Sequence, residues 1–323
     1  MVKLRKVQQT RTGTFFVCLP RSWAEEHGLR KGAQVALVGT SDGGLCIDTR
    51  SERGSQPKVT VLSPGPFLSR EIIGRYLLGF DVIRVEAKER FDFDVRTAIK
   101  QTVGSLVGLE IVEETSSQMV LQFLLEPSGF PPERLLARNL AIVSGMNRDA
   151  VGSFVDGDLQ LAKSVVARNS ESTRQYLLLV RILSTVAQDQ GLAEKLGLGP
   201  VDCLSYSLAA KFVEDLGDTS RQVANEALGL NGIKLSDEMK ALLDDLQKVC
   251  SGASDEAVKA FAGKDVFSAE NVRNMHAKID ALSGQVEEAA KNQPFSQLPQ
   301  ILAVTNLLRR VYDLSVSLAD LVG

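Results

Sequence analysis

One pair of carboxylates has the spacing that a metal site on a helix would use. Glu214 and Asp218 are four residues apart in the stretch AAKFVEDLGDTSRQVANEAL (209–228). In a helix they would lie one turn apart on one face, and their oxygens would suit Mg, Mn or Fe. Lys211 and Arg221 would share that face, so a solvated stripe of ion pairs is the simpler interpretation and a metal site is the alternative.

Other catalytic chemistry has little support in the sequence. The chain has only two histidines, His27 and His276, which are far apart, so we expect neither a histidine-based zinc site nor a Ser-His-Asp triad. A metal-dependent hydrolase that uses Glu214 and Asp218 is the least favoured hypothesis, because no histidine or cysteine stands near them. We therefore expect a protein that is not an enzyme and that requires no cofactor.

The composition is that of an ordinary soluble protein. The 323 residues are 44% hydrophobic and 24% charged, and no apolar run approaches the roughly 20 residues of a membrane helix. The charged N-terminus lacks the apolar segment of a signal peptide. The four cysteines form no CxxC pair, which favours a reducing compartment. We expect a cytoplasmic protein without membrane insertion.

Charge is distributed unevenly along the chain. The net charge is −3, but residues 1–50 contain eight Lys and Arg against four acids, which leaves −7 for the remainder. A basic head on an acidic body is typical of a protein in which only the head meets an anionic partner.

The first fifty residues predict a small β-rich unit. Ser22 and Glu25 have the spacing of a capping box, and Gly28 would end that short helix. The strand at Phe15–Leu19 is apolar on both faces, and so small a unit buries too little surface to be stable alone. We therefore expect two chains to exchange strands across a two-fold axis. The predicted order is a strand near 2–5, a turn at 10–13, the strand at 15–19, the helix, and strands at 35–38 and 45–47, with a tight turn at Asp42-Gly43 between the last two.

The stretch RKVQQTRTGTFFVCLPRSWAEEHGLRKGAQVALV (5–38) resembles the AbrB/SpoVT swapped-hairpin family. The resemblance covers roughly residues 3–49 and implies a domain at 1–50 in which two chains interlock into one barrel. It also implies DNA binding, with phosphate contacts that weaken as salt rises. A plain dimerisation barrel with a solvated basic face is the alternative. The DNA-binding residues implied by the resemblance are Lys3, Arg5, Lys6, Arg11 and Arg21.

Residues 58–126 predict a small α/β domain. Apolar spacing indicates the order β-α-β-α-β-β, with helices covering one sheet. No GxGxxG, P-loop or nucleophile elbow occurs in it. Arg70, Arg75 and Arg84 are interpreted as surface charges, and a sensory or dimerising module is possible.

Residues 133–323 predict a helical domain. Two rough repeats, 133–229 and 235–322, each end in a long helix with an aspartate at a matching place, Asp218 and Asp313. This pattern indicates two three-helix bundles side by side, so the whole chain is expected to be a multidomain α+β protein. The candidate helices are 133–155, 158–189, 200–229, 235–251, 254–263, 268–291 and 298–322.

Three stretches of this half resemble PhoU, the phosphate-uptake regulator, and in particular the archaeal-type proteins that join an AbrB-like head to a PhoU-like body. They are ARNSESTRQYLLLVRIL (167–183), the stretch 209–228, and LLRRVYDLSVSLADLV (307–322). The resemblance implies a dimeric regulator of phosphate uptake whose body contacts the ATPase of a phosphate transporter or a signalling protein. A transcription factor whose body senses phosphate or metal is the alternative. Metal ligands implied by the family are Glu214, Asp218, Asp280 and Asp313.

The sequence departs from the family's acidic pattern. Asn169 and Thr173 stand where carboxylates are expected, although Glu171 remains, and Arg309 replaces a glutamate. Arg309 lies four residues before Asp313, so we expect the two to form an ion pair that occupies the carboxylate internally.

Overall fold

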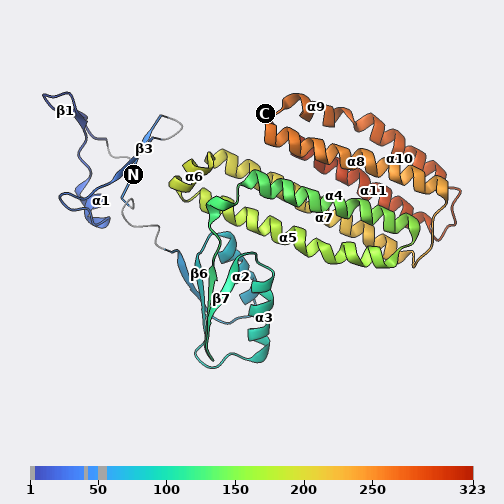
Figure 1. The fold of residues 1–323 in the computed structure, drawn as a ribbon, viewed down its shortest axis with the longest axis horizontal. Helices are drawn as coiled ribbons and strands as arrows, with labels where there is room; N and C mark the ends of the chain where they lie inside the picture. The colour runs from blue at the N-terminus through green and yellow to red at the C-terminus, as the bar shows by residue number, and fades with distance from the viewer. Residues whose placement is uncertain (1–3, 40–42, 50–56, 323) are drawn as a thin grey trace. The chain divides into compact units, whose positions relative to one another are not determined.

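The computed structural model describes residues 4–39, 43–49 and 57–322. The chain forms two compact units, Met1–Pro57 and Lys58–Gly323 (Figure 1). The regions predicted as an α/β domain and a helical domain therefore belong to one compact unit.

The first unit contains two separate two-stranded sheets. β1 (Gln8–Gln9) pairs antiparallel with β2 (Phe15–Phe16), and β3 (Ala36–Gly39) pairs antiparallel with β4 (Leu45–Asp48), with α1 (Arg21–Glu26) between the two hairpins. The predicted helix and the last two strands are confirmed, whereas the strand predicted at 15–19 is shorter and the first strand lies at Gln8–Gln9 instead of near residues 2–5. Residues 2–3 of that predicted strand, and Asp42 of the predicted tight turn, lie outside the described residues. The described residues of this unit form no closed barrel.

The turn and the helix of this unit test the local predictions. Gly13 has φ +93° and its N–H donates to the carbonyl of Thr10 at 3.0 Å, as a tight turn requires. The predicted capping box is wrong: α1 begins at Arg21, so Ser22 lies inside the helix and no side chain caps it. Glu25 instead accepts a hydrogen bond from Arg21 at 2.8 Å. The predicted helix end at Gly28 is confirmed by its φ of +67°.

Apolar side chains of the first unit are exposed. Phe15 on β2 is 68% exposed, and Leu45 on β4 is 66% exposed. Exposed apolar groups of this density are typical of an interaction surface. The two-chain barrel stays a prediction, consistent with these uncovered strands. The full set is Leu4, Val7, Phe15, Phe16, Val17, Leu37 and Leu45.

The second unit begins with an α/β layer in the predicted order. Its sheet has the strand order β5-β6-β8-β7, in which β5 and β6 are parallel and the other neighbours are antiparallel. Helices α2 and α3 bury Ile72, Tyr76 and Ile99 completely. The elements are β5 (Val59–Leu62), α2 (Leu68–Leu77), β6 (Val82–Glu86), α3 (Phe93–Gly104), β7 (Leu109–Glu114) and β8 (Gln118–Phe123).

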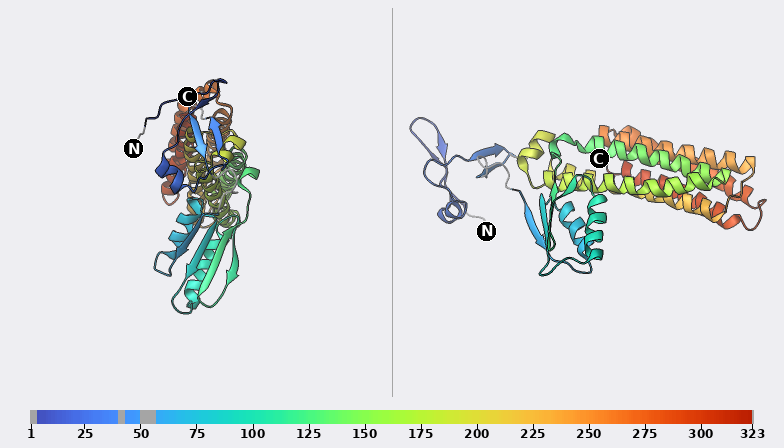
Figure 2. Two further views of the ribbon diagram at one scale, coloured as in Figure 1. Left: turned by 90° about the vertical axis from the view of Figure 1, so that its left-hand side faces the viewer. Right: turned by 60° about the horizontal axis from the view of Figure 1, so that its bottom comes forward.

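A short 3₁₀ turn, η1 (Pro127–Gly129), leads into the helical region. Helices α4, α5 and α7 pack on one another, as do α8, α10 and α11. The two groups meet where α7 contacts α11 and α4 contacts α8, so the long helices run side by side (Figures 1 and 2). The helices are α4 (Pro132–Asp156), α5 (Leu159–Val186), α6 (Gln190–Leu196), α7 (Pro200–Gly229), α8 (Asp237–Gly263), α9 (Val266–Asn274), α10 (His276–Ala290) and α11 (Leu298–Ala319).

Three helix boundaries differ from the predictions. The break expected after residue 251 is absent, because the helix continues through Gly252 while Cys250 and Ala253 are fully buried. The helix expected at 268–291 is interrupted at Met275. The sequence analysis missed α6, which Asp189 caps through the N–H of Leu192. Among the described residues, no helix combines the length and apolar character that a membrane span needs.

Candidate functional site

Three carboxylates gather on one face of α7. The nearest oxygens of Glu214, Asp215 and Asp218 all lie within 4.8 Å of one another. The sequence analysis singled out Glu214 and Asp218 but missed Asp215, although it directly follows Glu214 in the EDLGD stretch. Glu214 is 9% exposed, so the cluster is partly screened from water.

Two cations of the same helix already pair with these three carboxylates. Lys211 Nζ donates to Glu214 Oε2 and to Asp215 Oδ1, both at 2.7 Å, and Arg221 Nε donates to Asp218 Oδ1 at 3.3 Å. The predicted ion-pair stripe is therefore confirmed. Partial burial lowers the pKa of Lys211, but its hydrogen bonds to Asp215 and Glu214 outweigh that effect and raise the pKa above its usual value.

A side chain of α5 completes the cluster. Asn169 Nδ2 donates to Asp218 Oδ1 at 3.0 Å. α5 comes close to α7 here because residue 217 is glycine, where an added Cβ would lie 3.0 Å from Ser172 Oγ. Asn169 thus supplies a hydrogen-bond donor where the family resemblance implies an oxygen ligand.

The donors decide how well the cluster suits a divalent cation. A metal would need the oxygens that Lys211, Arg221 and Asn169 now bind, and Lys211 would have to leave before a cation could enter. The residues present fit an internally ion-paired cluster better than a resident metal.

The carboxylates of the second repeat lie apart from this cluster. Asp280 on α10 accepts a hydrogen bond from Arg309 Nη2 on α11 at 2.9 Å, and His276 Nε2 lies 3.1 Å from its other oxygen. The predicted pair of Arg309 with Asp313 is wrong, because Arg309 reaches across to α10. Asp313 is exposed and forms no ion pair with any described residue. Among the described residues, neither aspartate joins the group on α7.

The basic residues of the first unit are accessible. Arg5, Lys6, Arg11 and Arg21 are all exposed. Arg11 lies in the turn between β1 and β2, and Arg21 begins α1, where it pairs with Glu25. Lys3 lies outside the described residues.

The sequence analysis missed a buried arginine that joins the α/β layer to the bundle. Arg181 on α5 is 1% exposed, and its Nη1 donates to the carbonyls of Tyr76 and Phe80, both at 2.8 Å. Its Nη2 lies 3.7 Å from Asp81 Oδ1, and its guanidinium stacks 3.7 Å from the ring centre of Phe123. Burial lowers the pKa of Arg181 to about 10.

The signal for this contact was present in the sequence. Arg181 interrupts the apolar run LLLVRIL (177–183), and a charged residue in such a run must find partners when it is buried. The sequence could not say which carbonyls it binds, because they lie about a hundred residues earlier in the chain.

The helical region resembles known PhoU structures. Residues 136–227 match the family described as PhoU domain. The crystal structure of PhoU from Pseudomonas aeruginosa is 21% identical, with a TM-score of 0.52 over 59% of this chain and 93% of that chain. The phosphate transport system regulatory protein PhoU from Streptococcus pneumoniae is 16% identical, with a TM-score of 0.50 over 59% and 91%. No curated protein shows significant similarity to the chain.

These likenesses establish the class of fold. At such identities the structural matches show the fold alone, and together with the family match they place a PhoU-type helical domain in the C-terminal part of the chain. The matched residues 136–227 run from α4 through most of α7, so the carboxylate cluster lies inside the matched region.

Proposed function

We propose that this protein is a non-enzymatic, cytoplasmic regulator of phosphate uptake. The observation that carries the proposal is the PhoU domain match at 136–227 on a helical region with the PhoU fold. One solved protein of this fold is itself described as a regulator of a phosphate transport system. The helical body then docks on a protein partner, either the ATPase subunit of a phosphate transporter or a signalling protein.

The docking role is tested by capture from native extract. The full chain, immobilised at low and at high salt, retains a transporter ATPase or a signalling protein of the phosphate response, identified by mass spectrometry. The same capture with residues 1–57 removed would retain the partner as well, because Lys58–Gly323 is a compact unit. Loss of the partner in the shortened chain contradicts docking through the helical body.

We also propose that the first unit resembles the AbrB/SpoVT domain in function and holds two chains together. The exposed apolar strands support this, because a partner copy would bury them. The full chain should elute as a dimer at micromolar concentration by light scattering, and Phe15→Ser should shift it toward a monomer. Phe267→Ser is the matched control, since Phe267 on α9 is 75% exposed but lies in the other unit.

We further propose that this unit binds DNA. The supporting observation is the set of exposed cations Arg5, Lys6, Arg11 and Arg21. Gel shifts on DNA upstream of phosphate-uptake genes should weaken steeply as salt rises. Replacing Arg5, Lys6 and Arg11 by Gln removes six cations from the dimer, so the slope of log K against log salt should become shallower by about 5. Absence of any shift at low salt contradicts DNA binding and leaves the dimerisation barrel.

An alternative is a transcription factor whose body senses phosphate or metal. In that case the gel shift itself changes when phosphate or Mn²⁺ is added. If the body senses a metal, the ligands would be Glu214, Asp215 and Asp218. Asp280 and Asp313 of the second repeat are the weaker candidates. Lys211 binds Glu214 and Asp215, so Lys211→Met should show Mn²⁺ binding by calorimetry that the unaltered chain lacks. Adding Glu214→Gln to Lys211→Met should abolish this binding.

A further inference from the structure

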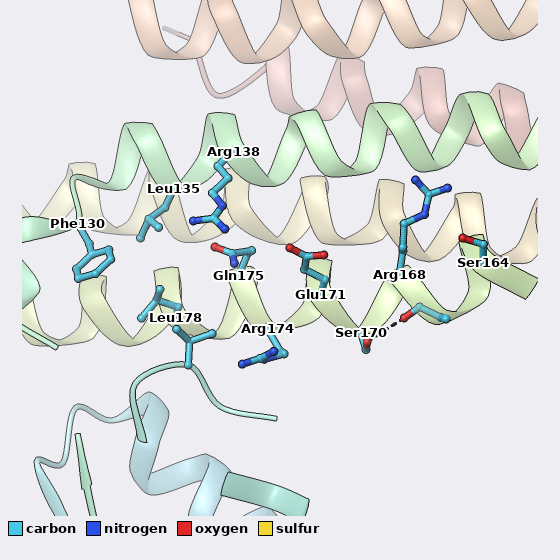
Figure 3. Close-up of a pocket in the computed structure, with 12 residues that line it drawn as sticks. Phe130, Leu135, Arg138, Ser164, Arg168, Ser170, Glu171, Arg174, Gln175 and Leu178 are labelled. Carbon is cyan, nitrogen blue, oxygen red and sulfur yellow. Dashed lines mark hydrogen bonds between the residues drawn. The ribbon is translucent and has the colours of Figure 1, made fainter. Parts of the chain in front are cut away.

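A groove lies where the bundle meets the α/β layer. Its volume is about 620 Å³, within the range of small-molecule sites. One wall is α4, another is a stripe of α5, and Val107 of the α3–β7 connection borders it. Figure 3 shows Arg138 of α4 extending toward Gln175 of α5 across this groove.

The groove is basic. Three arginines line it: Arg138, Arg168 and Arg174. Arg168 pairs with Asp149, whereas neither Arg138 nor Arg174 forms an ion pair or a hydrogen bond with any described residue, and both are exposed. Two unpaired guanidiniums match the charge of a phosphate monoester, which is about −1.5 to −2 near pH 7.

A buried amide faces the same space. Gln175 is 8% exposed and lines the groove, yet its Oε1 has no hydrogen-bond partner among the described residues. A buried polar atom without a partner is costly, and a ligand group would satisfy it. The amide can turn, so that it offers either its oxygen or its NH₂ group.

One end of the groove is apolar. Leu135 and Leu178 are 5% and 2% exposed, and Phe130 lies beside them in the close-up (Figure 3). The opposite end carries Arg168 and Ser164. An occupant that used the whole groove would combine an anionic group with an apolar or flat part.

We propose that this groove binds a small organic phosphate. The phosphate group lies against Arg138 and Gln175, and the apolar part of the molecule lies on Phe130 and Leu135. The site takes these contacts from α4, α5 and Phe130, which precedes α4. It does not depend on DNA binding or on the transport role.

Glu171 gives a second test of the phosphate site. It lines the same groove and has no hydrogen-bond or ion-pair partner among the described residues. Its negative charge opposes a bound phosphate. Glu171→Gln should therefore bind an organic phosphate severalfold more tightly, whereas Arg138→Gln should bind it about tenfold more weakly.

Calorimetry of the full chain tests the site with AMP and phenyl phosphate, and with adenosine and inorganic phosphate as the parts of AMP. We expect at least one of the two organic phosphates to bind with a Kd below 1 mM, and each separate part of AMP to bind more weakly than AMP. Arg148→Gln is the matched control, since Arg148 is an exposed arginine of α4 outside the groove. Circular dichroism confirms that each variant is folded.

The outcomes separate the possibilities. Binding by neither organic phosphate, equal weakening by Arg148→Gln and Arg138→Gln, or an unchanged Kd in Arg138→Gln overturns the proposal. Equal affinity for inorganic phosphate assigns the groove to free phosphate and overturns the organic ligand. Binding of an acidic peptide, with no binding of either small phosphate, assigns the groove to a protein partner and also overturns it.

Discussion

Two regions of this protein hold cations in opposite ways. At the junction of α5 with the α/β layer, Arg181 is 1% exposed and binds backbone carbonyls of another element. On the face of α7, the side chain of Lys211 is 48% exposed and binds carboxylates of its own helix. A buried cation contributes through the partners that it would leave unsatisfied, whereas an exposed cation competes with water and salt. Burial therefore decides which charge matters for stability.

The second repeat adds an intermediate arrangement. Arg309 and Asp280 pair across two helices, but their side chains are 41% and 44% exposed. The pair connects separate elements, as Arg181 does, and yet it is as open to water as Lys211. Comparing the three sites separates the effect of burial from the effect of joining two elements.

Replacing the buried arginine should have the largest effect. Arg181→Met leaves the carbonyls of Tyr76 and Phe80 without their donor, so we expect a loss of about 3 kcal/mol in the free energy of unfolding. Urea titration followed by circular dichroism measures it. The control is Arg70→Gln on the exposed side of α2, which should change the value by less than about 0.5 kcal/mol. A loss below about 1 kcal/mol for Arg181→Met would refute the role of burial.

A buried thiol should make stability fall at alkaline pH. Burial, with a smaller contribution from Asp313, raises the pKa of Cys250 from 9.0 to about 12. Above pH 9 the unfolded chain loses this proton while the folded chain keeps it, so stability decreases as pH rises through the window between the two values. The loss should reach about 2 kcal/mol near pH 10.5.

Cys250→Ala tests this effect through the slope of the free energy of unfolding against pH. Its free energy of unfolding starts lower because a side chain is lost from the core, but it should decline less steeply with pH than that of the unaltered protein. Cys18→Ala is the control, since Cys18 is exposed. Parallel declines for the unaltered protein and Cys250→Ala would show that Cys250 is not the source.

Removing the shared lysine of α7 should have a moderate effect. Lys211→Met leaves Glu214 and Asp215 without their common donor, and we expect a loss of about 1 kcal/mol because Glu214 is nearly buried. Lys248→Met is the matched control: Lys248 pairs with Asp245 three residues away, with both side chains more than half exposed. If the two variants lose the same stability, the partial burial of the cluster on α7 has no effect.

Arg309→Gln should have the smallest effect. Both partners of this pair are solvated, so we expect a change below about 0.5 kcal/mol that disappears at high salt. Arg310→Gln, at the exposed neighbouring position, controls for the loss of charge. A loss as large as that of Arg181→Met would mean that joining two helices matters more than burial.

Local patterns predicted much of the fold. The β-α-β-α-β-β order of the α/β layer is confirmed, as are the ends of α7 to within a residue. Predictions failed where a neighbour overrode a local signal: α8 continues through Gly252 because packed alanines and Cys250 hold it. The capping box failed because Pro20, and not Ser22, is the N-cap residue of α1, so the helix begins two residues earlier than predicted.

The candidate site likewise has contacts that the sequence predicted and contacts that it did not. The ion pairs of α7 follow from spacing, because residues three and four apart on a helix are neighbours wherever the helix lies. The partner of Arg309 could not be predicted, since Asp280 is far from it in sequence and α10 comes beside α11 only in the folded chain. The same holds for the groove between α4 and α5, whose arginines come from different helices.

The sequence by itself determined most of the helices and strands, the basic head, and the carboxylate stripe with its own cations, because these depend on residues close together in the chain. Only the tertiary structure decided that Arg181 is buried against two distant carbonyls, that Arg309 binds Asp280, and that Arg138 faces Gln175. The physical reason is that burial and long-range partners arise from the packing of whole elements, which short-range spacing does not specify.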